Sequence, residues 1–241
     1  MKLLQRVLRG LKHELACCRI SKTATSHEVY FGEFTQSLKA AISVGGSELG
    51  LGMMLFSLAV AVRAERVIEI GRFKGFSTLA LASAMRFIDW GWAEPTEALQ
   101  RPEVDYRKLH EPKERKLYSI DPTPTREAEE RIKRNNLSAY VEFINAKSND
   151  VDIDIVADII FIDGDHTYEG CRRDVETFVP RHLRRDGYFI LHDYYGWFDE
   201  EGRNNSPIKR VCDEIIASGR HEHILIDTCY PSFMVFRKVD Q

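Results

Sequence analysis

The sequence predicts an α/β fold with a doubly wound, mostly parallel sheet. Two observations predict it: short apolar runs rich in β-branched residues alternate with helical patterns, and several of these runs end in a glycine turn or in a carboxylate. The 241 residues could form one large domain or two small ones. We favour one domain.

We expect that domain to span residues 31–241, after an N-terminal helical arm over residues 1–30. The arm begins as a basic amphipathic helix, which could pack on a partner subunit, on the domain or on a membrane surface. Residues 87–115 carry two tryptophans but no clear period, and they are too long for an ordinary helix-to-strand connection. We therefore expect an insertion there that forms a lid or an assembly surface, so a homo-oligomer could form through either segment.

The composition argues against several classes of protein. A formal charge of −3, with acidic and basic residues mixed along the chain, gives no footprint for nucleic acid, so a small-molecule substrate is expected. Five cysteines without a C-x-x-C spacing support neither a disulfide framework nor a zinc site. Charges interrupt the first apolar run, and no window is apolar enough to span a membrane. These features predict a cytoplasmic protein.

The first informative motif is a strand, turn and helix from Val67 to Ala80. Its spacing, Gly71-x-x-x-Gly75, is neither the G-x-G-x-x-G of a dinucleotide fold nor a P-loop, which disfavours phosphate binding. Glu69 places a carboxylate before the turn, which suits a ligand with an ammonium group or ribose hydroxyls, such as S-adenosylmethionine. Tight strand–helix packing would explain the two glycines equally well.

This motif resembles the first motif of class I methyltransferases, acidic-x-Gly-x-x-x-Gly. The resemblance implies cofactor contacts from this stretch, at Glu69, Gly71, Phe73, Gly75 and Ser77. It also implies that the segment before the strand covers the methionine end of the cofactor, through Gly45, Gly46 and Glu48. A helix break with a cap is the alternative for that segment.

The next predicted strand, residues 116–120, delivers Asp121 to the same edge of the sheet. A carboxylate there can accept hydrogen bonds from both ribose hydroxyls. Alternatively, Asp121 is a turn residue before two prolines. In the resemblance, the turn holding Lys147 and Ser148 lies by the adenine, although a solvated turn is the simpler interpretation.

Two later strands end in groups that can bind metals or transfer protons. Residues 157–162 are followed by Asp163, Asp165 and His166, and residues 188–191 are followed by His192 and Asp193. The carboxyl ends of central parallel strands line one crevice, so Asp163, His192 and Asp193 can converge. Carboxylates with an imidazole suit Mg²⁺ or Mn²⁺.

From Gly45 to Gly196 these motifs resemble the metal-dependent sugar O-methyltransferases of the macrocin type and the cephalosporin hydroxylase-like group. The resemblance implies that Asp163, His192 and Asp193 are metal ligands and that His166 is the general base. His192 departs from the pattern, since those relatives carry an acidic residue there. The resemblance also implies a Rossmann-like seven-stranded sheet with one antiparallel strand near the C-terminus.

The C-terminal region supports the fold. Ser206-Pro207 should begin a helix that ends at Gly219, and residues 223–226 and 233–236 should pair as a hairpin. Three aromatic residues could line an acceptor pocket or pack under a loop: Tyr194, Tyr195 and Trp197.

The leading hypothesis is an S-adenosylmethionine-dependent O-methyltransferase that acts on a hydroxyl of a sugar or natural product, with help from a divalent metal. His166 and Asp163 would carry the chemistry, and Asp163 and Ser148 would also contact the cofactor. In the alternative interpretation, Asp163 and Asp165 are turn caps, His166 is structural and His192-Asp193 caps a loop. A nicotinamide-dependent oxidoreductase, disfavoured by the glycine spacing, and a non-catalytic nucleotide-binding or assembly protein are the other functions considered.

Overall fold

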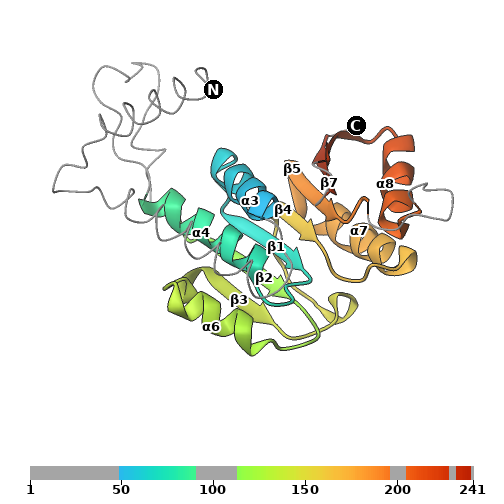
Figure 1. Ribbon diagram of the computed structural model, residues 1–241. Helices are drawn as coiled ribbons and strands as arrows, with labels where there is room; N and C mark the ends of the chain where they lie inside the picture. The colour runs from blue at the N-terminus through green and yellow to red at the C-terminus, as the bar shows by residue number, and fades with distance from the viewer. Residues whose placement is uncertain (1–48, 91–112, 196–204, 228–231, 240–241) are drawn as a thin grey trace, which may run out of the picture.

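The computed structural model describes residues 49–90, 113–195, 205–227 and 232–239 (Figure 1). Its helices are α3 (Leu49–Ala61), α4 (Phe76–Trp90), α6 (Arg126–Arg134), α7 (Tyr168–His182) and α8 (Pro207–Ala217), with short 3₁₀ turns η2 (Ser138–Tyr140) and η3 (Ser148–Asp150). Its strands are β1 (Arg66–Ile70), β2 (Lys116–Ile120), β3 (Val141–Ile144), β4 (Ala157–Ile162), β5 (Leu183–His192), β6 (His221–Asp227) and β7 (Ser232–Lys238).

The strands form a single seven-stranded sheet in the order β3-β2-β1-β4-β5-β7-β6. Strands β1 to β5 pair in parallel, and β7 runs antiparallel to both of its neighbours, β5 and β6. The predicted fold class is therefore confirmed, including the single antiparallel strand and the C-terminal hairpin. The chain reverses its direction of travel across the sheet between β1 and β4, and parallel sheets bind ligands at such a switch point.

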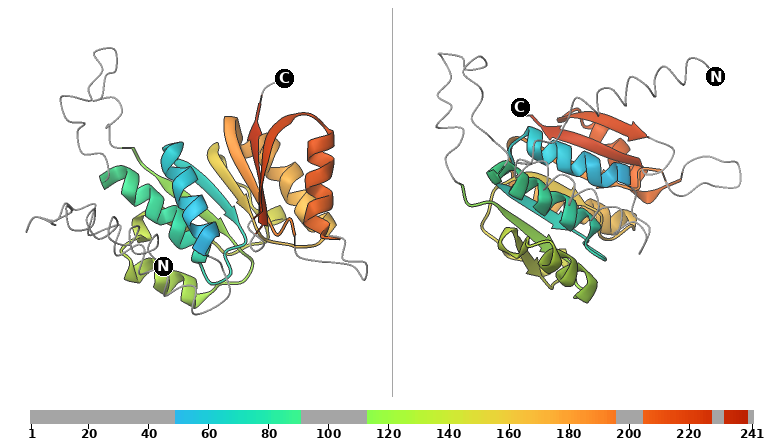
Figure 2. Two further views of the ribbon diagram at one scale, coloured as in Figure 1. Left: turned by 45° about the horizontal axis from the view of Figure 1, so that its top comes forward. Right: turned by 60° about the vertical axis from the view of Figure 1, so that its left-hand side comes forward.

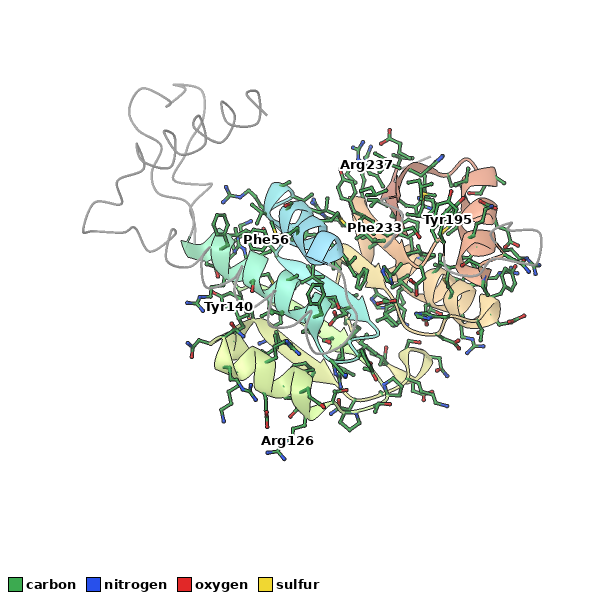
Figure 3. The ribbon with its side chains drawn as sticks, viewed as in Figure 1. Phe56, Arg126, Tyr140, Tyr195, Phe233 and Arg237 are labelled. Atoms are coloured by element: carbon green, nitrogen blue, oxygen red, sulfur yellow. The ribbon has the colours of Figure 1, made fainter. Side chains whose placement is uncertain are left out.

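Helices cover both faces of the sheet: α3 and α4 lie on one face, and α7 and α8 lie on the other (Figure 2). Successive residues of β1 alternate between the two cores, since Val67 belongs to the α3–α4 side and Ile68 to the α7–α8 side. Phe56 of α3 packs edge-on against Phe87 of α4, with 5.5 Å between ring centroids (Figure 3). This burial on both faces explains why the central strands are apolar throughout.

The strand register brings the ends of the central strands level. Ile70 of β1 pairs with Ile120 of β2 and with Ile162 of β4, which itself pairs with Leu191 of β5. The residues that come directly after these paired positions therefore share one edge of the sheet, as expected: Gly71, Asp121, Asp163 and His192, the last residue of β5.

Some boundaries differ from those expected. Helix α4 continues to Trp90, so it includes the first residues of the stretch assigned to an insertion, and β5 begins at Leu183 rather than at residue 188. The arm, residues 91–112 of the insertion, Gly45, Gly46, Glu48 and Trp197 lie outside the described residues, so the domain boundaries stay predictions. Within the described ranges, no helix combines the length and apolarity needed to cross a bilayer.

Candidate active site

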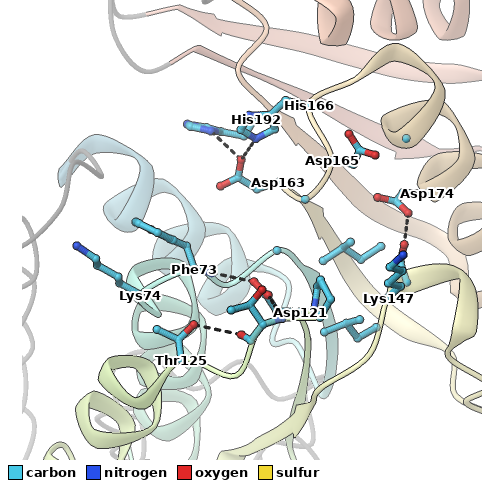
Figure 4. Close-up of a pocket in the computed structure, with 18 of the residues that line it drawn as sticks. Phe73, Lys74, Asp121, Thr125, Lys147, Asp163, Asp165, His166, Asp174 and His192 are labelled. Atoms are coloured by element: carbon cyan, nitrogen blue, oxygen red, sulfur yellow. Dashed lines mark hydrogen bonds and ion pairs between the residues drawn. The ribbon is translucent and has the colours of Figure 1, made fainter.

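A cavity of about 1280 Å³ opens at the carboxyl edge of the sheet (Figure 4). The turns after β1, β2, β4 and β5 line it, together with the η3 turn and the first residues of α6 and α7. Among the predicted site residues, those that line the cavity are Gly71, Phe73, Asp121, Ser148, Asp163, His166, His192 and Asp193. This volume exceeds what one drug-sized ligand needs and leaves room for a second molecule.

Gly71 allows a close approach between the turn after β1 and the β4–α7 loop. Its φ of +86° is in the left-handed region, and a Cβ atom there would lie 2.1 Å from the carbonyl oxygen of Asp163. The same residue lines the cavity. The absence of a side chain therefore lets the β4–α7 loop approach β1, which brings Asp163 to the ligand space.

Three predicted cofactor residues lie behind the cavity wall instead of lining it. Glu69 is fully buried and accepts hydrogen bonds from the hydroxyls of Ser77 (2.6 Å), Thr78 (2.6 Å) and Ser119 (2.5 Å). Burial raises the pKa of Glu69, although these hydroxyl donors oppose the shift. Glu69 and Ser77 thus fix the start of α4 to the sheet, a structural role that the sequence pattern does not distinguish from ligand contact.

Gly75 is the third of these residues. It has a φ of +76°, and a Cβ atom there would lie 2.8 Å from the Cβ of Ala128 in α6. Close helix packing, the alternative weighed for this glycine, is therefore the role that the structure gives it.

Asp121 fixes a turn and also faces the cavity. One oxygen, Oδ2, accepts the backbone N–H groups of Arg72 and Phe73, both at 3.1 Å, and Oδ1 accepts the N–H of Thr123 at 2.8 Å. Asp121 is therefore a turn residue, as in the alternative interpretation, and it also lines the cavity. Because a carboxylate has about four acceptor sites, it can still accept about one ribose hydroxyl.

Arg72 was not predicted, and it ties the turn after β1 to the ends of β2 and β3. It is only 2% exposed, and its guanidinium donates to the carbonyl of Ser119 (2.8 Å), to the carbonyl of Ile144 (3.5 Å) and to the side chain of Asn145. It also lies over the ring of Phe143, 5.1 Å from its centroid. An arginine between two glycines normally indicates an exposed turn, so the sequence carries no signal for this role.

Asp163, His192 and Asp193 converge as predicted. Nδ1 of His192 lies 3.1 Å from Oδ1 of Asp163 and 3.2 Å from Oδ1 of Asp193, and one ligand atom from each residue falls within 4.8 Å of the others. Two carboxylates and an imidazole are suitable donors for Mg²⁺ or Mn²⁺, whose neighbouring ligands lie about 3 Å apart. The buried Nε2 of His192 has no hydrogen-bond partner among the described residues, so the ring is not committed to a structural contact on that side. The residues therefore fit a divalent cation.

The electrostatics of this cluster favour a positive charge between the carboxylates. Burial alone would lower the pKa of His192, but its contacts with Asp163 and Asp193 outweigh burial and raise the pKa to about 10. Burial would raise the pKa of Asp163, yet hydrogen bonds from the two histidines lower it overall. Without a metal, a protonated His192 supplies the balancing charge.

His166 lies at the edge of this cluster. Its Nε2 is 3.2 Å from Oδ1 of Asp163 and 3.6 Å from Oδ2 of Asp193, and its side chain is 41% exposed. The hydrogen bond with Asp163 raises the pKa of His166 against the effect of burial. An accessible imidazole oriented by a carboxylate can accept a proton from a ligand in the cavity.

The neighbouring Asp165 has the structural role given by the alternative interpretation. It accepts the backbone N–H of Thr167 at 2.9 Å, and Thr167 in turn caps α7 by accepting the N–H of Gly170 at 3.0 Å. Asp165 therefore shapes the loop that presents Asp163 and His166.

Ser148 lines the cavity as predicted and donates a hydrogen bond to Asp174, a buried residue that sequence reasoning missed. A weak signal for Asp174 exists: it interrupts the buried face of α7 between Cys171 and Phe178. Lys147 also lines the cavity.

Tyr194 and Tyr195 do not line the cavity. The Tyr194 hydroxyl donates to Asp213 of α8 at 3.3 Å, and the Tyr195 N–H donates to Oγ of Ser232 at 2.5 Å. Figure 3 shows Tyr195 between α8 and β7. Packing under the loop, the alternative weighed for these residues, is what the structure shows.

Comparison with known proteins decides the family. A family described as a methyltransferase domain matches residues 68–194, which is more than half of the chain. The chain belongs to this family. The matched segment of the methyltransferase runs from β1 to the end of β5 and contains every strand that borders the cavity. No curated protein matches the chain.

Solved structures share the fold of the methyltransferase at low identity. A Podospora anserina methyltransferase bound to S-adenosylhomocysteine aligns with a TM-score of 0.60 and 14% identity, covering 86% of this chain and 88% of its own. An O-methyltransferase from Bacillus cereus, also with S-adenosylhomocysteine, aligns with a TM-score of 0.59 and 17% identity, covering 96% of this chain and 97% of its own. TomG, an O-methyltransferase from Streptomyces achromogenes in complex with S-adenosylmethionine, aligns with a TM-score of 0.56 and 15% identity, covering 90% of this chain and 97% of its own. The family match confirms the expected methyltransferase, and the solved structures share its expected fold.

Proposed function

We propose that this methyltransferase transfers a methyl group from S-adenosylmethionine to a hydroxyl of a small sugar or natural product, with a divalent metal bound by Asp163, His192 and Asp193. The observation that carries the proposal is that the glycine turn and this cluster, with His166, line the same cavity. A nucleoside cofactor and a metal-held acceptor would therefore meet in one space. The B. cereus protein and TomG are O-methyltransferases, which supports the choice of an oxygen acceptor.

The cofactor would lie along the turns after β1 and β2. Gly71 and Phe73 border the space for its methionine part, and Asp121 would accept a ribose hydroxyl. The nucleoside base would then extend towards Ser148, and the sulfonium would face Asp163. All of these residues line one continuous cavity, which supports this placement.

In the proposed reaction, the acceptor oxygen attacks the methyl carbon as the carbon–sulfur bond breaks. The bonding electron pair would go to sulfur, which leaves neutral S-adenosylhomocysteine, and the acceptor's proton would go to Nδ1 of His166, because Nε2 already donates its hydrogen to the Asp163 carboxylate. Asp163 orients the His166 ring through the contact at 3.2 Å. A bound divalent ion supplies acidification of the acceptor hydroxyl.

We also propose a cytoplasmic location. Cys171 and Cys212 are buried free thiols, as expected in a reducing compartment. The N-terminal arm and the insertion remain the segments through which we propose that a homo-oligomer forms.

Two binding measurements and one activity measurement test the proposal. Titration calorimetry should show binding of S-adenosylhomocysteine and none of NAD; the reverse result, or no binding of either, would overturn the cofactor assignment. Among a panel of hydroxylated acceptors, methyl transfer should need Mg²⁺ or Mn²⁺ and stop in chelator. Asp193→Ala should lose the metal-stimulated rate by at least about 100-fold while still binding S-adenosylhomocysteine. Full activity in chelator would exclude the metal role.

A further inference from the structure

Asp174 is a buried acid in the cavity wall that the proposed reaction does not use. It lies in the second turn of α7, is 4% exposed and lines the cavity. Figure 4 shows it beside Lys147, on the side of the cavity away from Phe73. A carboxyl group at such a position needs hydrogen-bond donors to offset the loss of water.

The donors supplied by the protein leave Asp174 incompletely satisfied. A carboxylate has about four acceptor sites, and the hydroxyl of Ser148 occupies one of them, on Oδ1. Within the part of the chain that the structure describes, no other hydrogen bond to this side chain is formed. Burial and the like charge of the nearby Asp165 raise the pKa of Asp174, although the Ser148 hydrogen bond and the positive charge of Arg173 oppose the shift. A ligand that brings an N–H donor would satisfy the Asp174 carboxylate.

The position of Asp174 identifies the part of the ligand that it faces, and this step rests on the proposed function. With the sulfonium at Asp163 and the ribose at Asp121, the nucleoside base would lie in the part of the cavity that the η3 turn borders, as in the proposed cofactor placement. We call this part of the cavity the η3 arm. Oδ2 of Asp174 lies at this arm: a Cβ atom on Gly164 would be 3.6 Å from it. The carboxyl group thus lies between the β4 turn and the η3 turn, at the end of the nucleoside space.

We propose that Asp174 accepts a hydrogen bond from the exocyclic amino group of the cofactor's adenine and selects an amino-purine over an oxo-purine. A carboxylate can only accept, so it pairs with the 6-amino group, whereas a 6-oxo group would direct a second acceptor at it. The Ser148 hydroxyl fixes the orientation of the carboxylate. Base recognition thus comes from α7 as well as from the turn after β3.

Two ligands that differ at one position test this proposal by titration calorimetry: S-adenosylhomocysteine, and S-inosylhomocysteine with oxygen in place of the 6-amino group. The unaltered protein should prefer S-adenosylhomocysteine by about 10- to 100-fold, as for a hydrogen bond to a charged group. Asp174→Asn, whose amide can donate to the oxo group, should narrow that ratio by about tenfold. The matched control is Asp152→Asn, because that side chain is 90% exposed and pairs with Arg181 outside the cavity.

The ratio of the affinities for the two ligands shows whether Asp174 recognises the base or only supports the η3 turn. If Asp174 only holds the η3 turn, Asp174→Asn will weaken the binding of both ligands alike. The ratio of the two affinities will then stay unchanged, which overturns the proposal. Equal binding of both ligands by the unaltered protein also overturns it, while S-adenosylhomocysteine binding still upholds the proposed cofactor. Failure to bind S-adenosylhomocysteine at all would instead refute the proposed function. Should circular dichroism show that Asp174→Asn is unfolded, the smaller Asp174→Ser is measured in the same way, and an unchanged ratio again overturns the proposal.

Discussion

His192 is the residue whose charge state matters most in the cluster. Its ring lies between two carboxylates that raise its pKa from 6.5 to about 10. A metal would take the Nδ1 lone pair that the proton occupies, so proton and metal compete for the same atom. A histidine in place of the acidic residue of the sugar O-methyltransferases that the sequence resembles would thus keep a metal donor at this position but add a proton that the metal must displace.

A pH dependence of stability follows for the metal-free protein. Because the folded pKa of His192 lies above its ordinary value, the contribution of its charge is complete below pH 6.5 and is lost as the pH rises towards about 10. In chelator, the melting temperature of the unaltered protein should therefore fall as the pH rises across this range, and that of the His192→Asn variant should fall less. Scanning calorimetry from pH 6 to pH 10 measures this. Identical pH profiles for the two proteins would contradict the assignment, and added Mn²⁺ should reduce the loss at high pH.

At the scale of elements, the turn between β1 and α4 depends on Gly71. The substitution Gly71→Ala places a Cβ atom 2.1 Å from the backbone of Asp163, so the β4–α7 loop must move. Gly219 is the matched control, since it also has a positive φ, +65°, but nothing lies within 4 Å of its Cβ position. Urea unfolding should show a loss of about 3 kcal/mol or more for Gly71→Ala, against about 1 kcal/mol for Gly219→Ala. Equal losses would show that only backbone strain matters at Gly71.

The contact between β1 and the start of α4 allows a second test. Glu69→Ala removes the acceptor of three buried hydroxyls and should cost about 3 kcal/mol of unfolding free energy, whereas Ser77→Ala removes one donor and should cost about 1 kcal/mol. Glu69→Gln keeps the shape and should leave S-adenosylhomocysteine affinity within about threefold, because Glu69 does not line the cavity. A folded Glu69→Gln variant that loses most of that affinity would restore Glu69 as a direct cofactor contact.

The sequence predicted the helices and strands better than it predicted whether a residue lines the cavity or packs behind its wall. Apolar runs and turn residues placed the strands, and the switch-point rule brought Asp163 and His192 together across 29 positions. Glu69 and Gly75 show the limit: a carboxylate or a glycine near a turn serves a ligand or a packed helix equally well, and only tertiary contacts separate the two. Arg72 and Asp174 were missed because their partners come from segments distant in the chain.

At the scale of the whole molecule, the cavity couples ligand binding to global stability. The proposed cofactor would contact turns from both halves of the sheet, so it would bind the folded chain and not the unfolded one. At 100 times its dissociation constant, S-adenosylhomocysteine should add about 2.7 kcal/mol to the unfolding free energy. Thermal melts over a ligand series measure this, with NAD as the control ligand. A melting temperature that does not change with S-adenosylhomocysteine would contradict the cofactor assignment.

The guanidinium of Arg72 joins the turn after β1 to the ends of two neighbouring strands, so this part of the cavity is organised in the absence of a ligand. It ties the methionine side of the cavity to the ends of β2 and β3, next to the nucleoside side, before any ligand arrives. Little conformational entropy then remains to be lost there, so the cofactor would enter a receptor that is already shaped for it. Within the described residues, the guanidinium of Arg72 makes no hydrogen bond to the loop that carries His166. That loop could therefore change in sequence to suit new acceptors while the turns proposed to hold the cofactor stay fixed.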